Sequence, residues 1–290
     1  MDIAYVGNRG HSIPTQFNEN AATVLGLPGN AGRPLFAPFN KSADVTTWIP
    51  TKSLYHSLQT KLDRRFNNGF LLTSSYTLGR GWSYNTGDSN SGIPTPADIE
   101  RSWARTDQDR LHTWVESFLY QLPVGPDRRW LKEGPLSQIL GGWQVGGFFT
   151  AQSGLPINFT MSAATLNAPG NTQRPNVSGT PAVLGNVGPG QLWFDTSVFS
   201  SPAANTFGNS PRNGVLDGPR FVNLDATLAK LFSFPHGVKG EFRADVFNVT
   251  NTPHFDRPNG TFLGATFGQI TATAPGLDQR SMRFGFRLTF

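Results

Sequence analysis

Residues 53–65 read Ser-Leu-Tyr-His-Ser-Leu-Gln-Thr-Lys-Leu-Asp-Arg-Arg, and residues 70–79 read Phe-Leu-Leu-Thr-Ser-Ser-Tyr-Thr-Leu-Gly. In the first stretch Leu54, Leu58 and Leu62 fall on one face, and charged or polar side chains fall on the other, which is the period-two pattern of a β-strand. Asn67-Asn68-Gly69 lies between the two stretches. Because Asn and Gly tolerate positive φ, this tripeptide favours a tight turn. The two stretches are therefore predicted to form an antiparallel hairpin.

The same alternation recurs along the chain. It is clearest at the C-terminus, where Met282, Phe284, Phe286, Leu288 and Phe290 alternate with Ser, Arg, Gly, Arg and Thr. A strand that crosses the hydrocarbon layer at a tilt needs about 9–11 residues, and most of these segments have that length or slightly more. The further predicted strands are residues 2–6, 110–122, 142–153, 221–232, 239–249 and 281–290. The chain is thus predicted to contain about eight strands.

The connections between these strands alternate in length. Residues 66–69 and 233–238 are short turns, and residues 122–140 form an intermediate connection. Four long connections are rich in Gly, Pro, Asn and Ser: 8–51, 80–109, 154–219 and 250–279. Loops longer than about 12–15 residues are uncommon in compact soluble domains. Long loops on one side of a meander and short turns on the other are typical of an outer-membrane barrel.

The composition agrees with this fold class. Hydrophobic residues make up 37% of the 290 residues and charged residues only 15%, while 32 Gly and 22 Pro disfavour helical bundles. A barrel wall with one apolar and one polar face also explains a mean hydropathy of −0.31. We predict an all-β fold, an antiparallel up-and-down transmembrane β-barrel segment of about eight strands. Soluble sheets show the same alternation of apolar and polar side chains, so the pattern alone does not show whether the sheet lies in lipid or in water.

Other bulk features exclude several classes of protein. The chain has no cysteine, which excludes disulfide scaffolds and thiolate metal sites. The net charge of +5 is not concentrated in any stretch, so we expect no nucleic-acid partner. No run of apolar residues is long enough for a transmembrane helix. The N-terminus lacks the basic start, apolar core and cleavage site of a signal peptide.

The chain ends on an aromatic residue, Phe290, in phase with Phe284, Phe286 and Leu288. A terminal Phe that closes an alternating aromatic strand resembles the assembly signal of bacterial outer-membrane β-barrels. This resemblance implies that the barrel-assembly machinery is a partner and that outer-membrane lipid surrounds the folded chain.

Several ordered blocks resemble the C-terminal barrel of TonB-dependent outer-membrane receptors, especially the Oar-like group. The blocks span nearly the whole chain and comprise residues 4–10, 55–62, 65–69, 75–77, 142–147, 151–156, 245–251 and 283–290. They include Gly-Trp-Gln-Val-Gly-Gly at 142–147 and Asp-Val-Phe-Asn-Val-Thr-Asn at 245–251.

The resemblance implies a large plugged barrel that imports a bulky ligand with energy supplied through TonB. This chain departs from that pattern, because it shows no plug domain, no TonB-contact segment and no signal peptide. Residues 1–290 are therefore interpreted as a partial outer-membrane barrel domain, which is not competent for transport alone. A sheet cut from a large barrel keeps gentle curvature, so we expect an open curved sheet. The imported ligand is not identified.

No motif indicates enzyme chemistry. The histidines at positions 11, 56, 112, 236 and 254 are scattered, without metal-ligand spacing. Asp107 and Asp109 lack the rest of a calcium loop and are interpreted as a solvated loop-to-strand junction. Ser153 lacks the Gly-x-Ser-x-Gly elbow of a hydrolase. We predict no catalytic residue, no metal and no cofactor.

Two other interpretations stay open. One is a self-contained outer-membrane barrel of eight strands with a structural or adhesive role, because about eight strands can close a small barrel filled by side chains. The other is a soluble β-sandwich that binds a partner through its long loops.

Overall fold

The computed structural model describes residues 1–84, 94–126, 128–234, 237–276 and 279–290. Its strands are β1 (Asp2–Asn18), β2 (Thr46–Asn67), β3 (Phe70–Ser83), β4 (Ala104–Arg105), β5 (His112–Gln121), β6 (Trp143–Gln152), β7 (Asn176–Val177), β8 (Phe199–Ser200), β9 (Phe221–Ser233), β10 (Lys239–Phe247) and β11 (Ser281–Thr289). Its helices are α1 (Phe36–Phe39), α2 (Ile99–Ser102), α3 (Pro135–Leu140) and the 3-10 helix η1 (Ala163–Leu166). Within the described residues, no helix is both long and apolar enough to span a membrane.

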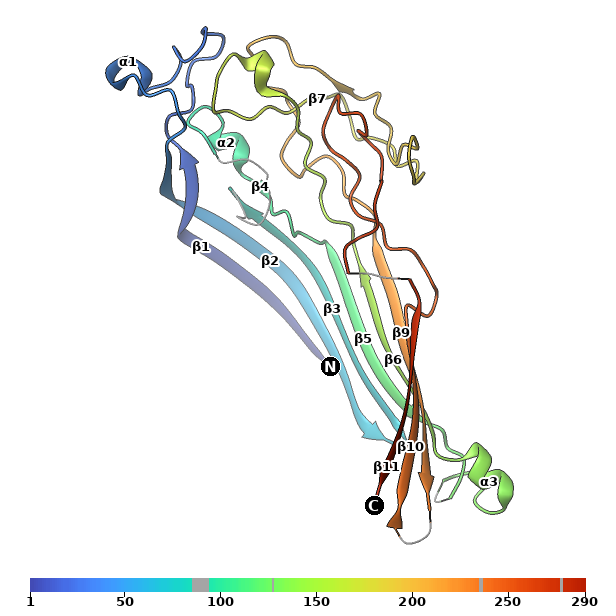
Figure 1. Cartoon of the computed structure of the whole chain (residues 1–290). Helices are drawn as coiled ribbons and strands as arrows, with labels where there is room; N and C mark the ends of the chain where they lie inside the picture. Colours follow the sequence, from blue (N-terminus) through green and yellow to red (C-terminus); the bar gives the residue numbers. More distant parts are fainter. Residues whose placement is uncertain (85–93, 127, 235–236, 277–278) are drawn as a thin grey trace.

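Eight long strands form one antiparallel meander in the order β1-β2-β3-β5-β6-β9-β10-β11, and the short β4 pairs with β3. Every long strand therefore pairs with its neighbour in the chain, as the predicted hairpins require. All eight strands expected from the sequence are present. The long connections lie together at one end of the sheet, and α3 lies at the opposite end (Figure 1). The all-β prediction is confirmed.

The register places the apolar positions of all eight strands on one face, called here the apolar face. Tyr5 pairs with Leu58, and Leu58 pairs with Leu78, while Phe242 pairs with Phe286. The register also places Glu116 on the apolar face, opposite Ser74 and Phe149. Members of the apolar face include Ile3, Tyr5, Leu58, Leu62, Leu72, Phe118, Val145, Phe149, Leu224, Leu228, Phe284 and Phe286.

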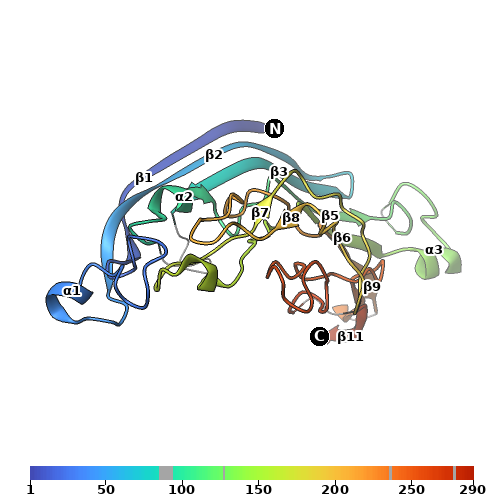
Figure 2. The same cartoon turned by 90° about the horizontal axis from the view of Figure 1, so that it is seen from above.

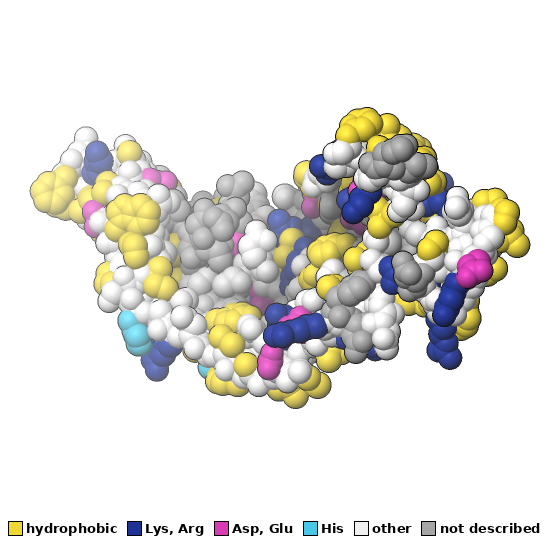
Figure 3. Space-filling model, turned by 90° about the horizontal axis from the view of Figure 1, so that it is seen from below, with side chains coloured by type: hydrophobic (Ala, Val, Ile, Leu, Met, Phe, Trp, Pro, Cys, Tyr) yellow, Lys and Arg dark blue, Asp and Glu magenta, His cyan; other side chains and the backbone are white. Residues whose placement is uncertain are grey.

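The main sheet is curved and does not close. The edge strands β1 and β11 each have one partner, and they do not pair with each other. Seen from above, the sheet is an arch whose concave side holds the long connections (Figure 2). Seen from the end that carries α3, the molecule is hollowed between its two arms, and hydrophobic side chains lie along the outer rim (Figure 3). The expectation of an open curved sheet is confirmed.

The first hairpin is longer than its sequence pattern indicates. β1 continues to Asn18 and β2 begins at Thr46, so parts of the predicted loop 8–51 are strand. Pro14 pairs with Pro50, and a register shift at Ser12, which has a φ of 55°, interrupts the alternation. Proline is tolerated there because it occupies strand positions that lack a second partner. At Pro50, β2 pairs with β1 alone, since its pairing with β3 begins at Ser53.

Among the described residues, the hydrophobic clusters of buried residues lie in the long connections, whereas the buried hydrophobic residues of the main sheet are the alanines Ala104, Ala229 and Ala244. Phe159 and Phe194 contact each other edge to face, with ring centroids 5.5 Å apart, and both are fully buried. The core also contains Ile157, Trp193, Phe199 and Ile270. These residues come from the connection before β9 and the connection before β11. We call the four long connections, those before β2, β5, β9 and β11, the loop layer.

Candidate functional site

A groove with a mixed lining, called here the polar groove after its charged side chains, runs over the concave face of the sheet, between β5, β6, β9 and β10. Its volume is about 560 Å³, and its polar lining includes Gln144, Asp225, Thr227, Glu241, Arg243 and Asp245. Leu119, Phe148 and Phe247 supply apolar parts of this lining. The Thr227 hydroxyl donates to the Asp245 carboxylate at 2.6 Å, and Arg243 Nε donates to the same carboxylate at 2.9 Å. These side chains lie on the face opposite the apolar face. The groove can therefore hold water or a polar ligand beside fixed charges of both signs.

A smaller polar pocket of about 250 Å³ adjoins this groove where β9, β10 and β11 meet the loop layer. It shares Asp225 and Phe247 with the groove. Asn223 Nδ2 donates to Asp225 Oδ1 at 2.9 Å, and the backbone N–H of Asn248 donates to the same oxygen at 2.8 Å. The block at 245–251 thus anchors the chain to β9 as it leaves β10.

Two buried polar atoms line this pocket without a hydrogen-bond partner among the described residues. They are Nε2 of His254 and Oδ1 of Asn223. His254 is only 6% exposed, and its ring packs against Phe221 with the centroids 4.5 Å apart. Burial lowers the pKa of His254, and the nearby Asp225 carboxylate opposes this shift. A neutral imidazole nitrogen in a pocket is a hydrogen-bonding group available to a ligand.

The loop layer is predicted to lose stability as the pH falls below the ordinary histidine pKa of 6.5. An opened state binds the proton at that pH, whereas the buried His254 resists it, so acid favours opening. Hydrogen exchange at the amide of Ala274, which donates to the His254 carbonyl at 2.8 Å, measures this opening. A His254→Phe variant keeps a ring beside Phe221 and should remove much of the pH dependence. Identical exchange of the two proteins between pH 7 and 5 contradicts the prediction.

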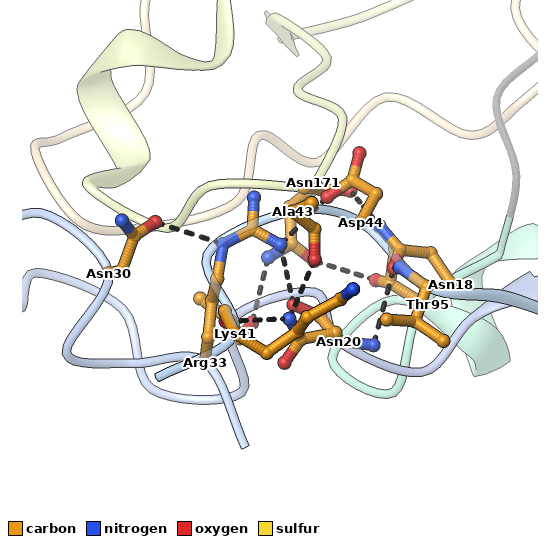
Figure 4. Close-up of polar contacts among 12 residues, drawn as sticks. Asn18, Asn20, Asn30, Arg33, Lys41, Ala43, Asp44, Thr95 and Asn171 are labelled. Atoms are coloured by element: carbon orange, nitrogen blue, oxygen red, sulfur yellow. Dashed lines mark hydrogen bonds and ion pairs between the residues drawn. The ribbon is translucent and has the colours of Figure 1, made fainter. Parts of the chain in front are cut away.

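Polar contacts tie the loop layer together, both within the connection before β2 and between separate connections (Figure 4). Arg33 Nη1 donates to the Asn20 carbonyl at 2.6 Å and to Asp44 Oδ1 at 2.7 Å. Thr95 donates to Asn171 Oδ1 at 2.6 Å, and Asn171 Nδ2 donates to the Ala22 carbonyl at 2.7 Å. Three connections that are distant in sequence therefore meet at Asn171. The outer end of the sheet carries an ordered layer.

The structure contradicts the interpretation of Asp107 and Asp109 as a solvated loop-to-strand junction. They were expected at a solvated junction, but they are 2% and 5% exposed. The Asp109 carboxylate accepts from Arg80 at 2.6 Å and from Arg105 at 2.8 Å, and Arg105 also donates to Asp217 at 2.7 Å. A buried carboxylate needs such partners to offset its desolvation. This network links the connection before β5 to β3 and to the connection before β9.

The predicted assembly-signal residues lie on the last strand. Phe284, Phe286 and Leu288 belong to the apolar face, and Phe284 and Phe286 are 69% and 61% exposed. Phe290 follows the end of β11. Their role in assembly stays a prediction.

The histidines do not converge. His56 and His112 each contact a tyrosine hydroxyl on a neighbouring strand, from Tyr5 and Tyr76. His11 lies on β1, and His236 lies outside the described residues. Within the described part of the chain, no three His, Cys, Asp or Glu residues are placed to hold a metal ion. Ser153 Oγ accepts from the backbone N–H of His112 at 3.1 Å.

The polar pocket was not found by sequence reasoning. Asn223 and Asp225 lie on one alternating strand and Arg283 on another, and their convergence depends on the register of three strands, which no local pattern shows. The one available signal was the block at 245–251, whose Asn248 reaches Asp225 through its backbone N–H.

Comparison with known proteins agrees with this geometry. A family model described as an outer membrane beta barrel domain matches residues 1–283. Comparison with curated proteins and with solved structures finds no match. The match covers nearly the whole chain, and an apolar face, a polar face and one-sided long connections are what such a barrel requires. The chain belongs to the outer membrane beta barrel domain family, and it is placed in the outer membrane.

Proposed function

We propose that this chain is the C-terminal part of the barrel of a TonB-dependent outer-membrane receptor, which takes up a bulky ligand. In this proposal the apolar face meets lipid, the polar groove and polar pocket line the lumen, and the loop layer forms the outer entrance. The role is that of a receptor and transporter, not of an enzyme. TonB would act through a plug domain, and the chain alone would not transport.

The observation that carries the proposal is the open, gently curved sheet of eight sequential strands. In lipid, each unpaired backbone N–H or C=O costs several kcal/mol, so β1 and β11 need further strands beside them. Barrel diameter grows with strand number, and gentle curvature indicates a large barrel. Eight strands with a polar concave face fit one part of a wide lumen. The sequence blocks that resemble the Oar-like group support the receptor assignment.

Cysteine cross-linking in the outer membrane of producing cells tests the proposal. The chain has no cysteine, so each introduced pair is unique. Ala4→Cys is combined in turn with Arg283→Cys, Gly285→Cys and Arg287→Cys, which cover several registers of a β1–β11 pairing. We expect no disulfide in these pairs, because β1 and β11 lie at opposite edges. An Ala4→Cys/Gln59→Cys pair is the positive control, because these residues are register partners.

A charged maleimide gives a second readout in the same cells. Thr227→Cys should react, because its side chain lines the water-filled groove, whereas Ala226→Cys should not, because it lies on the apolar face. Cross-linking of β1 to β11, together with an unreactive residue 227, would instead support the small closed barrel, whose interior is filled by side chains. The soluble β-sandwich is not supported, because within the described residues the eight long strands form a single sheet.

A further inference from the structure

An apolar groove lies at the end of the sheet that carries α3. It has a volume of about 510 Å³, and every residue that lines it is hydrophobic. Trp143, Val145 and Leu228 form its floor and belong to the apolar face, while Leu131 and Leu140 of the connection before β6 form its wall. The groove is therefore continuous with the surface that a barrel of this family turns to lipid. Because the long connections are extracellular in such barrels, this end is periplasmic.

Lys230 holds α3 in place beside this groove. Its Nζ donates to the carbonyl oxygens of Gln138 and Gly141 at 3.0 and 3.2 Å, and it also contacts the Ile139 carbonyl. The same ammonium lies 5.0 Å from the centroid of the Trp143 ring. Lys230 thus supplies hydrogen-bond donors to backbone carbonyls at the C-terminal end of α3. As a result, the exposed side chains of Leu136 and Ile139 project from a fixed helix.

The connection around the groove combines exposed apolar residues with basic residues. Trp130, Leu136 and Ile139 are 55%, 58% and 62% exposed. Arg128, Arg129 and Lys132 outnumber Asp127 and Glu133 in this segment. Lys132 directly follows Leu131 of the groove wall and is exposed. Arg129 is two residues before Leu131, and its guanidinium carbon lies 5.5 Å from the centroid of the Trp130 ring. Apolar side chains next to cations suit the boundary between acyl chains and anionic headgroups.

We propose that the apolar groove binds an anionic phospholipid of the periplasmic leaflet of the outer membrane. One acyl chain lies in the groove against Trp143 and Leu228, and the phosphate is bound by Arg129 and Lys132. The lipid fills a surface that strands alone leave indented, and it fixes the depth of α3 at the interface. This site depends on the barrel lying in the outer membrane and is independent of the TonB-dependent role.

Photo-cross-linking in cells that produce the full chain tests the site. A photoreactive phenylalanine analogue replaces Ile139 in one variant and Phe286 in another, because the two residues are equally exposed, at 62% and 61%. Phe286 lies on the apolar face away from the groove and reports bulk lipid. Mass spectrometry then identifies the adducts. Phospholipid adducts are expected at both positions, with anionic headgroups enriched at position 139.

Reversal of the two proposed headgroup cations provides the decisive comparison. One Lys or Arg near a membrane surface changes the binding of anionic lipid by about fivefold. Two such cations together change the binding by about 25-fold. Arg129→Glu/Lys132→Glu should therefore lower the anionic adduct at position 139 by about 25-fold and leave position 286 unchanged. Lys41→Glu/Arg220→Glu, which reverses two exposed cations outside the groove, is the charge-matched control. Equal headgroup composition at both positions, an unchanged yield in the double variant, or an adduct with a protein at position 139 would each overturn the proposal.

Discussion

Ala226→Arg is expected to destabilise the folded chain in the membrane by about 2–4 kcal/mol, the range found for Arg or Lys on the lipid face at the bilayer midplane. Ala226 pairs with Gly147 at the centre of the β6–β9 ladder, on the apolar face. Val246 of β10 is its partner on the other side. None of these three residues carries a group that could pair with a guanidinium. The free energy of unfolding by urea, measured on membrane-embedded protein, reports the effect.

Thr227→Arg is the matched control for this substitution. Thr227 is adjacent in sequence and lies at the same depth, but it lines the polar groove, where its hydroxyl bonds to Asp245. An arginine there meets water and carboxylates, so the loss of stability should be much smaller. Equal destabilisation by the two variants would show that the apolar face does not meet lipid in the folded protein.

Removal of the terminal aromatic pattern is expected to reduce the amount of chain in the outer membrane to a small fraction of the normal level. The variant combines deletion of Phe290 with Phe286→Ala. Both residues are in phase on the apolar side of the last strand, where the proposed recognition by the barrel-assembly machinery takes place. Quantitative immunoblots of isolated outer membranes after a short pulse of synthesis measure the effect.

Arg287→Ala and Thr289→Ala test whether the pattern or merely the strand matters. These residues alternate with the aromatic ones and occupy the other face of β11. They should leave the outer-membrane level close to normal. If the aromatic variant assembles as well as these controls, Phe284, Phe286, Leu288 and Phe290 are not an assembly signal.

The strands were predictable because apolar and polar residues alternate between neighbouring positions of each strand. Leu58 and Gln59, or Phe284 and Gly285, differ in solvent preference, and period two is visible within a few residues. The end of β1 was not predictable, because Pro14 and Pro50 read as loop residues in isolation. They are accommodated only because each occupies a strand position with one partner. A pairing between distant segments decided that boundary.

The candidate site was less predictable than the strands. Asp225, Asn248 and His254 meet only when β9, β10 and the following connection are in register. The loop layer also depends on contacts between distant residues. Arg105 Nη1 donates to Asp217 Oδ1 at 2.7 Å, although the two residues are 112 positions apart in the sequence. Composition marked these connections as polar and rich in Gly and Pro. It did not show that Phe159, Phe194 and Phe199 bury one another there.

The sequence by itself determined the all-β class, the eight strands and the two chemically different faces, because alternation is a local property of neighbouring side chains. Only the tertiary structure decided that Asp107 and Asp109 are buried in ion pairs and that the long connections form a packed layer. Those outcomes depend on contacts between residues far apart in the chain. Their free energy comes from burial and pairing of groups that no local pattern brings together.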